Sequence, residues 1–123
     1  MSKKILIVDD EPNIVISLEF LMKKEGFQIA VATDGEDALA KVASFSPDLI
    51  LLDVMMPKKS GFEVCEALRS DAANNEMKIV MLTAKGRETE VAKGLAIGAN
   101  AYVTKPFSTK ELLGKVKGML EAS

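Results

Sequence analysis

The sequence PDLILLDVMMP at residues 47–57 decides the fold class of this chain. Residues 49–52 at its centre are all apolar, and the run ends abruptly at Asp53. A strand with one face in water alternates apolar and polar residues, whereas a strand covered by helices on both faces is apolar throughout. The stretch therefore predicts a buried strand of a parallel sheet, with a carboxylate at its carboxyl end.

Four further apolar runs surround this stretch, at residues 5–8, 29–31, 79–82 and 101–103. The segments between the runs have the apolar spacing of helices. Pro12 stands where a first helical residue belongs, and Ser60 and Ser108 each precede a glutamate by three residues, as in a capping box. Repeated alternation of strand and helix predicts a parallel sheet with right-handed crossovers. Because five units are too few for an eight-stranded barrel, we expect an α/β fold with an open, doubly wound (βα)5 sheet.

The composition is typical of one globular domain, and we expect residues 1–123 to form it. Of the 123 residues, 48% are apolar and 28% are charged, and the net charge is −2. The single cysteine, Cys65, excludes an intramolecular disulfide. Because the chain has no histidine, it cannot form a Ser–His or Cys–His nucleophile pair or a histidine metal site.

The same composition argues against membrane and nucleic-acid partners. No apolar stretch approaches the roughly 20 residues that span a bilayer, and the N-terminal apolar run ends in two aspartates, unlike a signal peptide. The isoelectric point, near 5.2, disfavours a DNA-binding surface. We therefore expect a cytoplasmic protein that binds neither membranes nor nucleic acid directly.

Chemically active side chains stand at the ends of four of the five predicted strands. These are Asp9, Asp10 and Glu11 after the first run, Asp53 after the third, Thr83 after the fourth and Lys105 after the fifth. Ligands of open α/β sheets bind at this edge. Clustered carboxylates repel one another unless a cation joins them, and their oxygens suit Mg²⁺. One carboxylate could then act as a nucleophile toward a phosphoryl group, whose oxygens a lysine and a hydroxyl would bind.

Each of these residues also has a simpler interpretation when taken alone. Asp9 and Asp10 could cap the helix that begins at Pro12. Thr83 fits a strand through its β-propensity, and most lysines, such as Lys105, are solvated. Asp53 has no such simple interpretation, because a charge that ends a fully apolar run has no packing purpose. The placement of all these side chains at the ends of four strands makes coincidence improbable.

The sequence around these residues resembles the receiver domain of bacterial two-component response regulators. The matching segments are residues 5–12, residues 47–57 with Gly61, residues 80–84 and residues 99–107. The resemblance covers essentially the whole chain. It implies a flavodoxin-like fold whose five-stranded parallel sheet has the order 2-1-3-4-5, as in chemotaxis receivers.

The resemblance also implies a role for each site residue. Asp53 would be the phosphoacceptor, and Thr83 and Lys105 would bind the phosphoryl group, with room left by the small Ala84. A Mg²⁺ ion, or Mn²⁺ in its place, would be held by Asp9, mainly through water, and by Asp10, Asp53 and the Met55 carbonyl. The bond between Lys105 and Pro106 would be cis.

By the same resemblance, Thr83 and Tyr102 would form a conformational switch. Thr83 would move toward the phosphoryl group, and the Tyr102 ring would turn inward. This would change the surface of the fourth helix, fifth strand and fifth helix, through which receivers dimerise or bind partners. Without the resemblance, Tyr102 would be interpreted as a strand residue covering the sheet edge.

The expected function is therefore a phosphorylation-activated signalling switch, not a metabolic enzyme. A sensor histidine kinase or a histidine phosphotransfer protein would supply the phosphoryl group, and the chain would catalyse only its own phosphotransfer and autodephosphorylation. Met55 and Lys85 would flank the path of hydrolytic water and set the phosphoryl lifetime. The chain could be a stand-alone receiver or part of a longer regulator.

Three alternatives differ in the residues they need. A haloacid dehalogenase-like phosphatase needs Asp-x-Asp after the first strand, whereas Asp9 and Asp10 are adjacent. A nucleotide or flavin module needs a glycine-rich loop there. A degenerate receiver would bind partners without phosphorylation, and the intact set of Asp10, Asp53, Thr83 and Lys105 argues against it.

Overall fold

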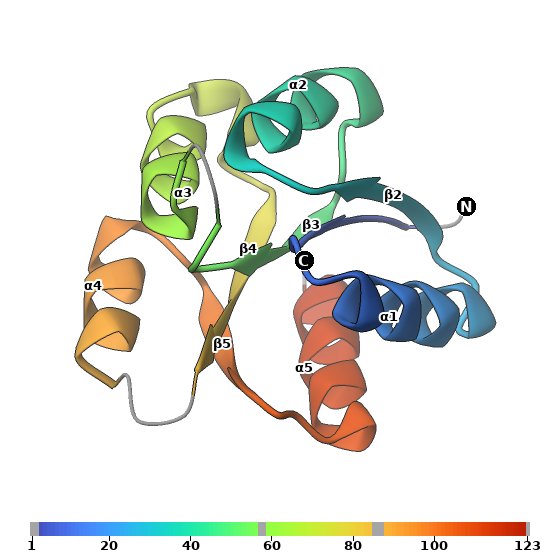
Figure 1. The fold of residues 1–123 in the computed structure, drawn as a ribbon. Coiled ribbons are helices and arrows are strands. Elements are labelled where there is room, and N and C mark those ends of the chain that lie inside the picture. The colour runs from blue at the N-terminus through green and yellow to red at the C-terminus, as the bar shows by residue number, and fades with distance from the viewer. Residues whose placement is uncertain (1–2, 57–58, 85–87, 123) are drawn as a thin grey trace.

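The computed structural model describes residues 3–56, 59–84 and 88–122 (Figure 1). Strands and helices alternate along the chain, as the sequence predicts. The strands are β1 (Lys4–Val8), β2 (Gln28–Ala32), β3 (Leu49–Asp53), β4 (Lys78–Ala84) and β5 (Ala101–Lys105). The helices are α1 (Pro12–Lys24), α2 (Gly35–Phe45), α3 (Gly61–Arg69), α4 (Glu88–Ile97) and α5 (Thr109–Ala122), with a 3-10 turn, η1 (Ala72–Asn74), before β4.

The five strands form one parallel sheet in the order β2-β1-β3-β4-β5. The predicted order 2-1-3-4-5 is confirmed. Because β1 and β3 are neighbours, with Val8 opposite Leu52, the residues that follow β1 come to lie beside the end of β3. Strand β4 is the next neighbour and places Leu82 opposite Asp53.

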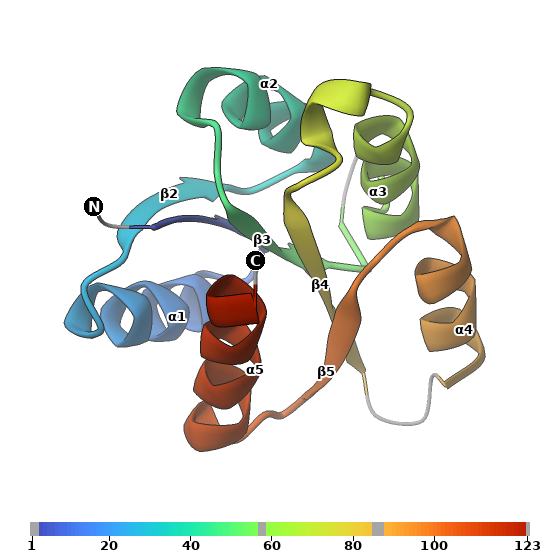
Figure 2. The same ribbon diagram turned by 180° about the vertical axis from the view of Figure 1, so that it is seen from behind.

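Helices cover both faces of the sheet, which explains the continuously apolar strands. Helices α1 and α5 lie on one face and α2, α3 and α4 on the other, as Figures 1 and 2 show from opposite sides. Alternate residues of β1 enter different cores: Leu6 and Val8 pack with α2 and α3, whereas Ile5 and Ile7 pack with α1 and α5. All four are fully buried.

The predicted helix starts can be compared with their hydrogen bonds. Pro12 is the first residue of α1. Both halves of the predicted capping box at Ser60 form. At Ser108, the hydroxyl accepts a hydrogen bond from the Glu111 backbone N–H at 3.1 Å. The expected cis bond between Lys105 and Pro106 is confirmed.

Within the described residues, no helix is both long enough and apolar enough to cross a bilayer.

Candidate active site

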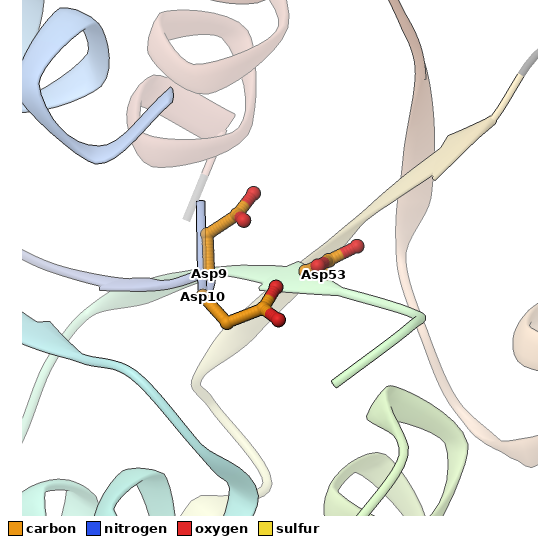
Figure 3. Close-up of side chains that lie close together, drawn as sticks. All are labelled: Asp9, Asp10 and Asp53. Carbon is orange, nitrogen blue, oxygen red and sulfur yellow. The ribbon is translucent and has the colours of Figure 1, made fainter. Parts of the chain in front are cut away.

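Three carboxylates meet at the carboxyl ends of β1 and β3 (Figure 3). Asp9 and Asp10 follow β1 directly, and Asp53 is the last residue of β3. One oxygen of each side chain lies within 4.8 Å of the others. Asp9 is completely buried and Asp53 is 5% exposed, while Asp10 is open to solvent. The cluster therefore joins two desolvated charges to one that solvent can reach.

The ammonium group of Lys105 sits among these carboxylates. Lys105 ends β5, and its Nζ lies 2.8 Å from Asp9 Oδ2 and 3.5 Å from Asp53 Oδ1. Burial lowers the pKa of Lys105, but the hydrogen bond to Asp9 and the charge of Asp53 outweigh it, so that the pKa is raised overall. Lys105 is therefore a permanent cation at this site.

The surroundings of Asp53 perturb the ionisation of its carboxylate. Burial, together with the charge of Asp9, raises its pKa from 3.8 to about 6. The charge of Lys105 opposes this rise, as does the Met55 backbone N–H, which donates to Asp53 Oδ1 at 3.3 Å. The charge of Lys105 therefore offsets the effects of burial and of Asp9 on this pKa only in part.

The donor set fits a hard divalent cation. Three carboxylates can each offer one oxygen to a common point, and the exposed Asp10 leaves a side of the cluster open to water. Mg²⁺ prefers such oxygen ligands and keeps several waters. A cation at this point would also offset the negative charge of Asp9, which acts together with burial to raise the pKa of Asp53.

The turn after β3 holds this arrangement through a close backbone approach. The Val54 N–H donates to the Leu82 carbonyl at 3.1 Å, and the Gly61 N–H donates to the Val54 carbonyl at 2.9 Å. A Cβ on Gly61 would collide with the backbone of Asp53 and Val54. Only glycine fits here. Met55, between these anchors, is 57% exposed beside Asp53.

Thr83 and Tyr102 lie on neighbouring strands and line one narrow apolar hollow with Val54, Val91 and Leu95. Thr83 is 3% exposed and follows Leu82, the residue opposite Asp53. Tyr102 is 37% exposed. The Lys115 ammonium lies 5.0 Å from the centre of its ring and donates to its carbonyl at 2.8 Å. The ring is thus partly in solvent, next to a hollow that Thr83 also lines.

The structure thus brings together the predicted residues Asp9, Asp10, Asp53 and Lys105, and it places Met55 beside them. Lys85, predicted to act with Met55, lies outside the described residues. The roles assigned to these side chains remain predictions.

The capping interpretation of the two aspartates is correct only in part. Asp9 Oδ1 accepts a hydrogen bond from the Glu11 N–H at 3.0 Å, but Glu11 itself is the N-cap of α1. Sequence reasoning assigned no role to Glu11, whose carboxylate lies 3.2 Å from Lys105 Nζ. The position of Glu11 before Pro12 could have pointed to a role in the site, because glutamate is not among the preferred N-cap residues.

Residues 5–117 match the family model described as the response regulator receiver domain. Among solved structures, the chain is similar to a protein assigned as a response regulator from Chloroflexus aurantiacus, with 33% identity and a TM-score of 0.94 over 98% of this chain and 99% of that one. It is also similar to the chemotaxis response regulator CheY4 of Vibrio cholerae, with 32% identity and a TM-score of 0.91 over 97% of this chain and 99% of that one. NtrX of Brucella abortus is 26% identical with a TM-score of 0.92, and the match covers 99% of this chain but 27% of NtrX.

Proposed function

The chain belongs to the response regulator receiver domain family, and from this premise we propose that it is a phosphorylation-activated switch whose phosphoacceptor is Asp53. The family serves two-component signalling, in which receivers interact with histidine kinases and histidine phosphotransfer proteins. The proposed donor is the phosphohistidine of such a protein, and the proposed place of the reaction is the cytoplasm. The chain would assist this transfer and the later hydrolysis of its own phosphoryl group, without acting on a metabolite.

The proposed reaction forms one bond and breaks another. A carboxylate oxygen of Asp53 attacks the phosphorus atom, a P–O bond forms, and the P–N bond to the donor imidazole breaks with its electron pair going to nitrogen. The product is an aspartyl phosphate. Asp53 must be ionised to attack, which a pKa of about 6 permits at neutral pH.

The surrounding residues would stabilise charge on the transferred group. Lys105, 3.5 Å from Asp53 Oδ1, would pair with one phosphoryl oxygen, and the Thr83 hydroxyl would donate to another. Asp9, Asp10, Asp53 and the Met55 carbonyl would hold Mg²⁺, which when bound supplies charge neutralisation and orientation. Most of the catalysis would be positioning, because these side chains are set by strand ends.

The proposed output is a change at α4, β5 and α5. Thr83 lines the same hollow as Tyr102, so a Thr83 side chain drawn toward Asp53 would leave room for the tyrosine ring to turn inward. The ring would then exchange its partly exposed position for a buried one. This would alter a surface that binds a partner or a second copy of the chain.

One observation carries the proposal: a buried carboxylate with a raised pKa lies within reach of a lysine and two further carboxylates. The test is the intact mass of the protein after incubation with acetyl phosphate, with and without Mg²⁺. We expect a Mg²⁺-dependent gain of one phosphoryl group in the wild type and none in Asp53→Asn.

Asp71→Asn is the matched control, because Asp71 is an exposed aspartate that caps η1 beyond the opposite end of the sheet. It should gain the phosphoryl group normally. A gain that survives Asp53→Asn would mean that the nucleophile is another residue. No gain in the wild type would favour a receiver that acts without phosphorylation.

A further inference from the structure

The ammonium group of Lys105 is shared among three carboxylates that differ in burial. Its distances are 2.8 Å to Asp9, 3.2 Å to Glu11 and 3.5 Å to Asp53. The Glu11 side chain is 60% exposed, whereas those of Asp9 and Asp53 are almost entirely buried. Glu11 therefore attracts the lysine from the solvent side, and the phosphoacceptor is the most distant of its three partners.

Helix capping does not account for a glutamate at position 11. Glu11 is the N-cap of α1, yet its side chain forms no capping hydrogen bond. Serine, threonine, aspartate and asparagine are the residues that cap helices well. A residue that is poor for its local position, but paired with a site lysine, indicates a role in the site.

The backbone of Glu11 is held beside the site. Its N–H donates to Asp9 Oδ1 at 3.0 Å, and Pro12 follows as the first residue of the helix. Asp9 is thus held at one oxygen by Glu11 and at the other by Lys105. The contact between Glu11 and Lys105 closes this ring of interactions at the mouth of the site.

We propose that Glu11 is a positioning residue that competes with the incoming phosphoryl group for the Lys105 ammonium and so slows phosphoryl gain by Asp53. The inference rests on the proposed function. The lysine can pair fully with phosphoryl oxygens only when its contact with Glu11 weakens. Glu11 would touch neither the phosphoryl group nor the reacting oxygen, and it would act entirely through Lys105.

The test compares Glu11→Gln with the wild type, because glutamine keeps the size and the backbone N–H but removes the charge. Glu19→Gln is the matched control, since Glu19 is on the same helix and pairs only with the exposed Lys23 among described residues. Rates of phosphoryl gain are measured at neutral pH with dianionic acetyl phosphate and with monoanionic phosphoramidate. We expect Glu11→Gln to react about two- to fivefold faster, the size expected of a partly exposed ion pair.

The two donors separate this role from simple repulsion of the donor by Glu11. Competition for Lys105 gives the same acceleration with both donors, whereas repulsion gives a larger one with the dianion. The side-chain ¹⁵N signal of Lys105 should also shift in metal-free Glu11→Gln and not in Glu19→Gln. A merely structural role of Glu11 would not shift this signal.

Unchanged rates, an acceleration confined to acetyl phosphate, or an unmoved Lys105 signal would each overturn the inference while leaving the proposed function intact. A wild type that gains no phosphoryl group from either donor would overturn both.

Discussion

Within strand β3, residues Leu49 to Leu52 and the final residue Asp53 are buried to nearly the same extent, but burial has opposite effects on them. The leucine and isoleucine side chains lose contact with water and gain close packing on both faces of the sheet. The carboxylate loses hydration that nothing in its surroundings replaces fully, and its pKa rises to about 6. Burial thus stabilises residues 49–52, the packed region of the strand, and destabilises the ionised form of Asp53, the strained region.

The packed residues of β3 hold its charged end in place. The pairing of β3 with β1 and β4 fixes the position of each of its residues along the sheet. The packed residues before Asp53 therefore determine where its carboxylate lies. The apolar core can therefore hold like charges together that would otherwise separate. We therefore expect substitutions in the two regions to change the free energy of unfolding in opposite directions.

The largest expected effect is in the packed region. Leu51 is completely buried in the core formed with α1 and α5. We expect Leu51→Ala to lower the free energy of unfolding by about 2–5 kcal/mol, because it removes apolar contacts and leaves a cavity. Urea unfolding followed by circular dichroism measures the change.

Ile16→Ala is the control for this prediction, since Ile16 is 64% exposed on α1. It should change the free energy of unfolding by less than about 0.5 kcal/mol. Equal losses in the two variants would show that burial does not distinguish the two positions.

The packed region was the part of the fold most readily predicted from the sequence. The runs of β1, β3 and β4 are apolar throughout because helices cover both faces of the sheet. These runs therefore predicted a parallel sheet. The bounds of β4 were less accurate: the apolar run is residues 79–82, but the strand extends from Lys78 to Ala84. Pairing with β3 and β5 continues into polar residues, which an apolar pattern does not include.

The closeness of Asp9, Asp10 and Asp53 was predicted from the sequence. Residues that follow parallel strands lie at one edge of the sheet, and the resemblance to receiver domains made the first and third strands neighbours. The contact between Glu11 and Lys105 could not be predicted in this way, because it depends on the conformations of two long side chains. Nor could the raised pKa of Asp53, which reflects its degree of burial and several opposing charges.

The second prediction concerns the strained region. In the metal-free protein at neutral pH, we expect Asp53→Asn to increase the free energy of unfolding by up to about 3 kcal/mol. The folded-state pKa of Asp53, about 6, lies above its ordinary value of 3.8, so the folded state favours the protonated form. Relative to Asp53→Asn, the free energy of unfolding of the wild type is therefore highest below about pH 4 and falls as the pH rises through about 6.

The stability of Asp53→Asn relative to the wild type should therefore be near zero in acid and greatest above about pH 6. Urea unfolding of both proteins across this range, with a chelator present, measures the difference. A constant difference at all pH values would mean that Asp53 is not strained by burial.

The smallest effect concerns the cation that would relieve the strain. A proton on Asp53 and a Mg²⁺ ion at the proposed site would compete for the same oxygens, so the affinity for Mg²⁺ should depend on the pKa of Asp53. Above about pH 7 the carboxylate is ionised and the apparent dissociation constant should be independent of pH. Below about pH 6 it should rise by up to about tenfold for each pH unit, which corresponds to about 1.4 kcal/mol of binding free energy.

Amide NMR titrations of the wild type with Mg²⁺, at constant ionic strength, measure this dependence. Asp53→Asn should bind Mg²⁺ more weakly, and its affinity should lack the pH dependence centred near 6, because the asparagine side chain is not protonated in this range. If the wild type bound Mg²⁺ equally well at about pH 5 and at about pH 7, Asp53 would not be a ligand that must lose a proton. The pKa of Asp53, raised by burial and by the charge of Asp9, would then have no bearing on cation binding at the end of β3.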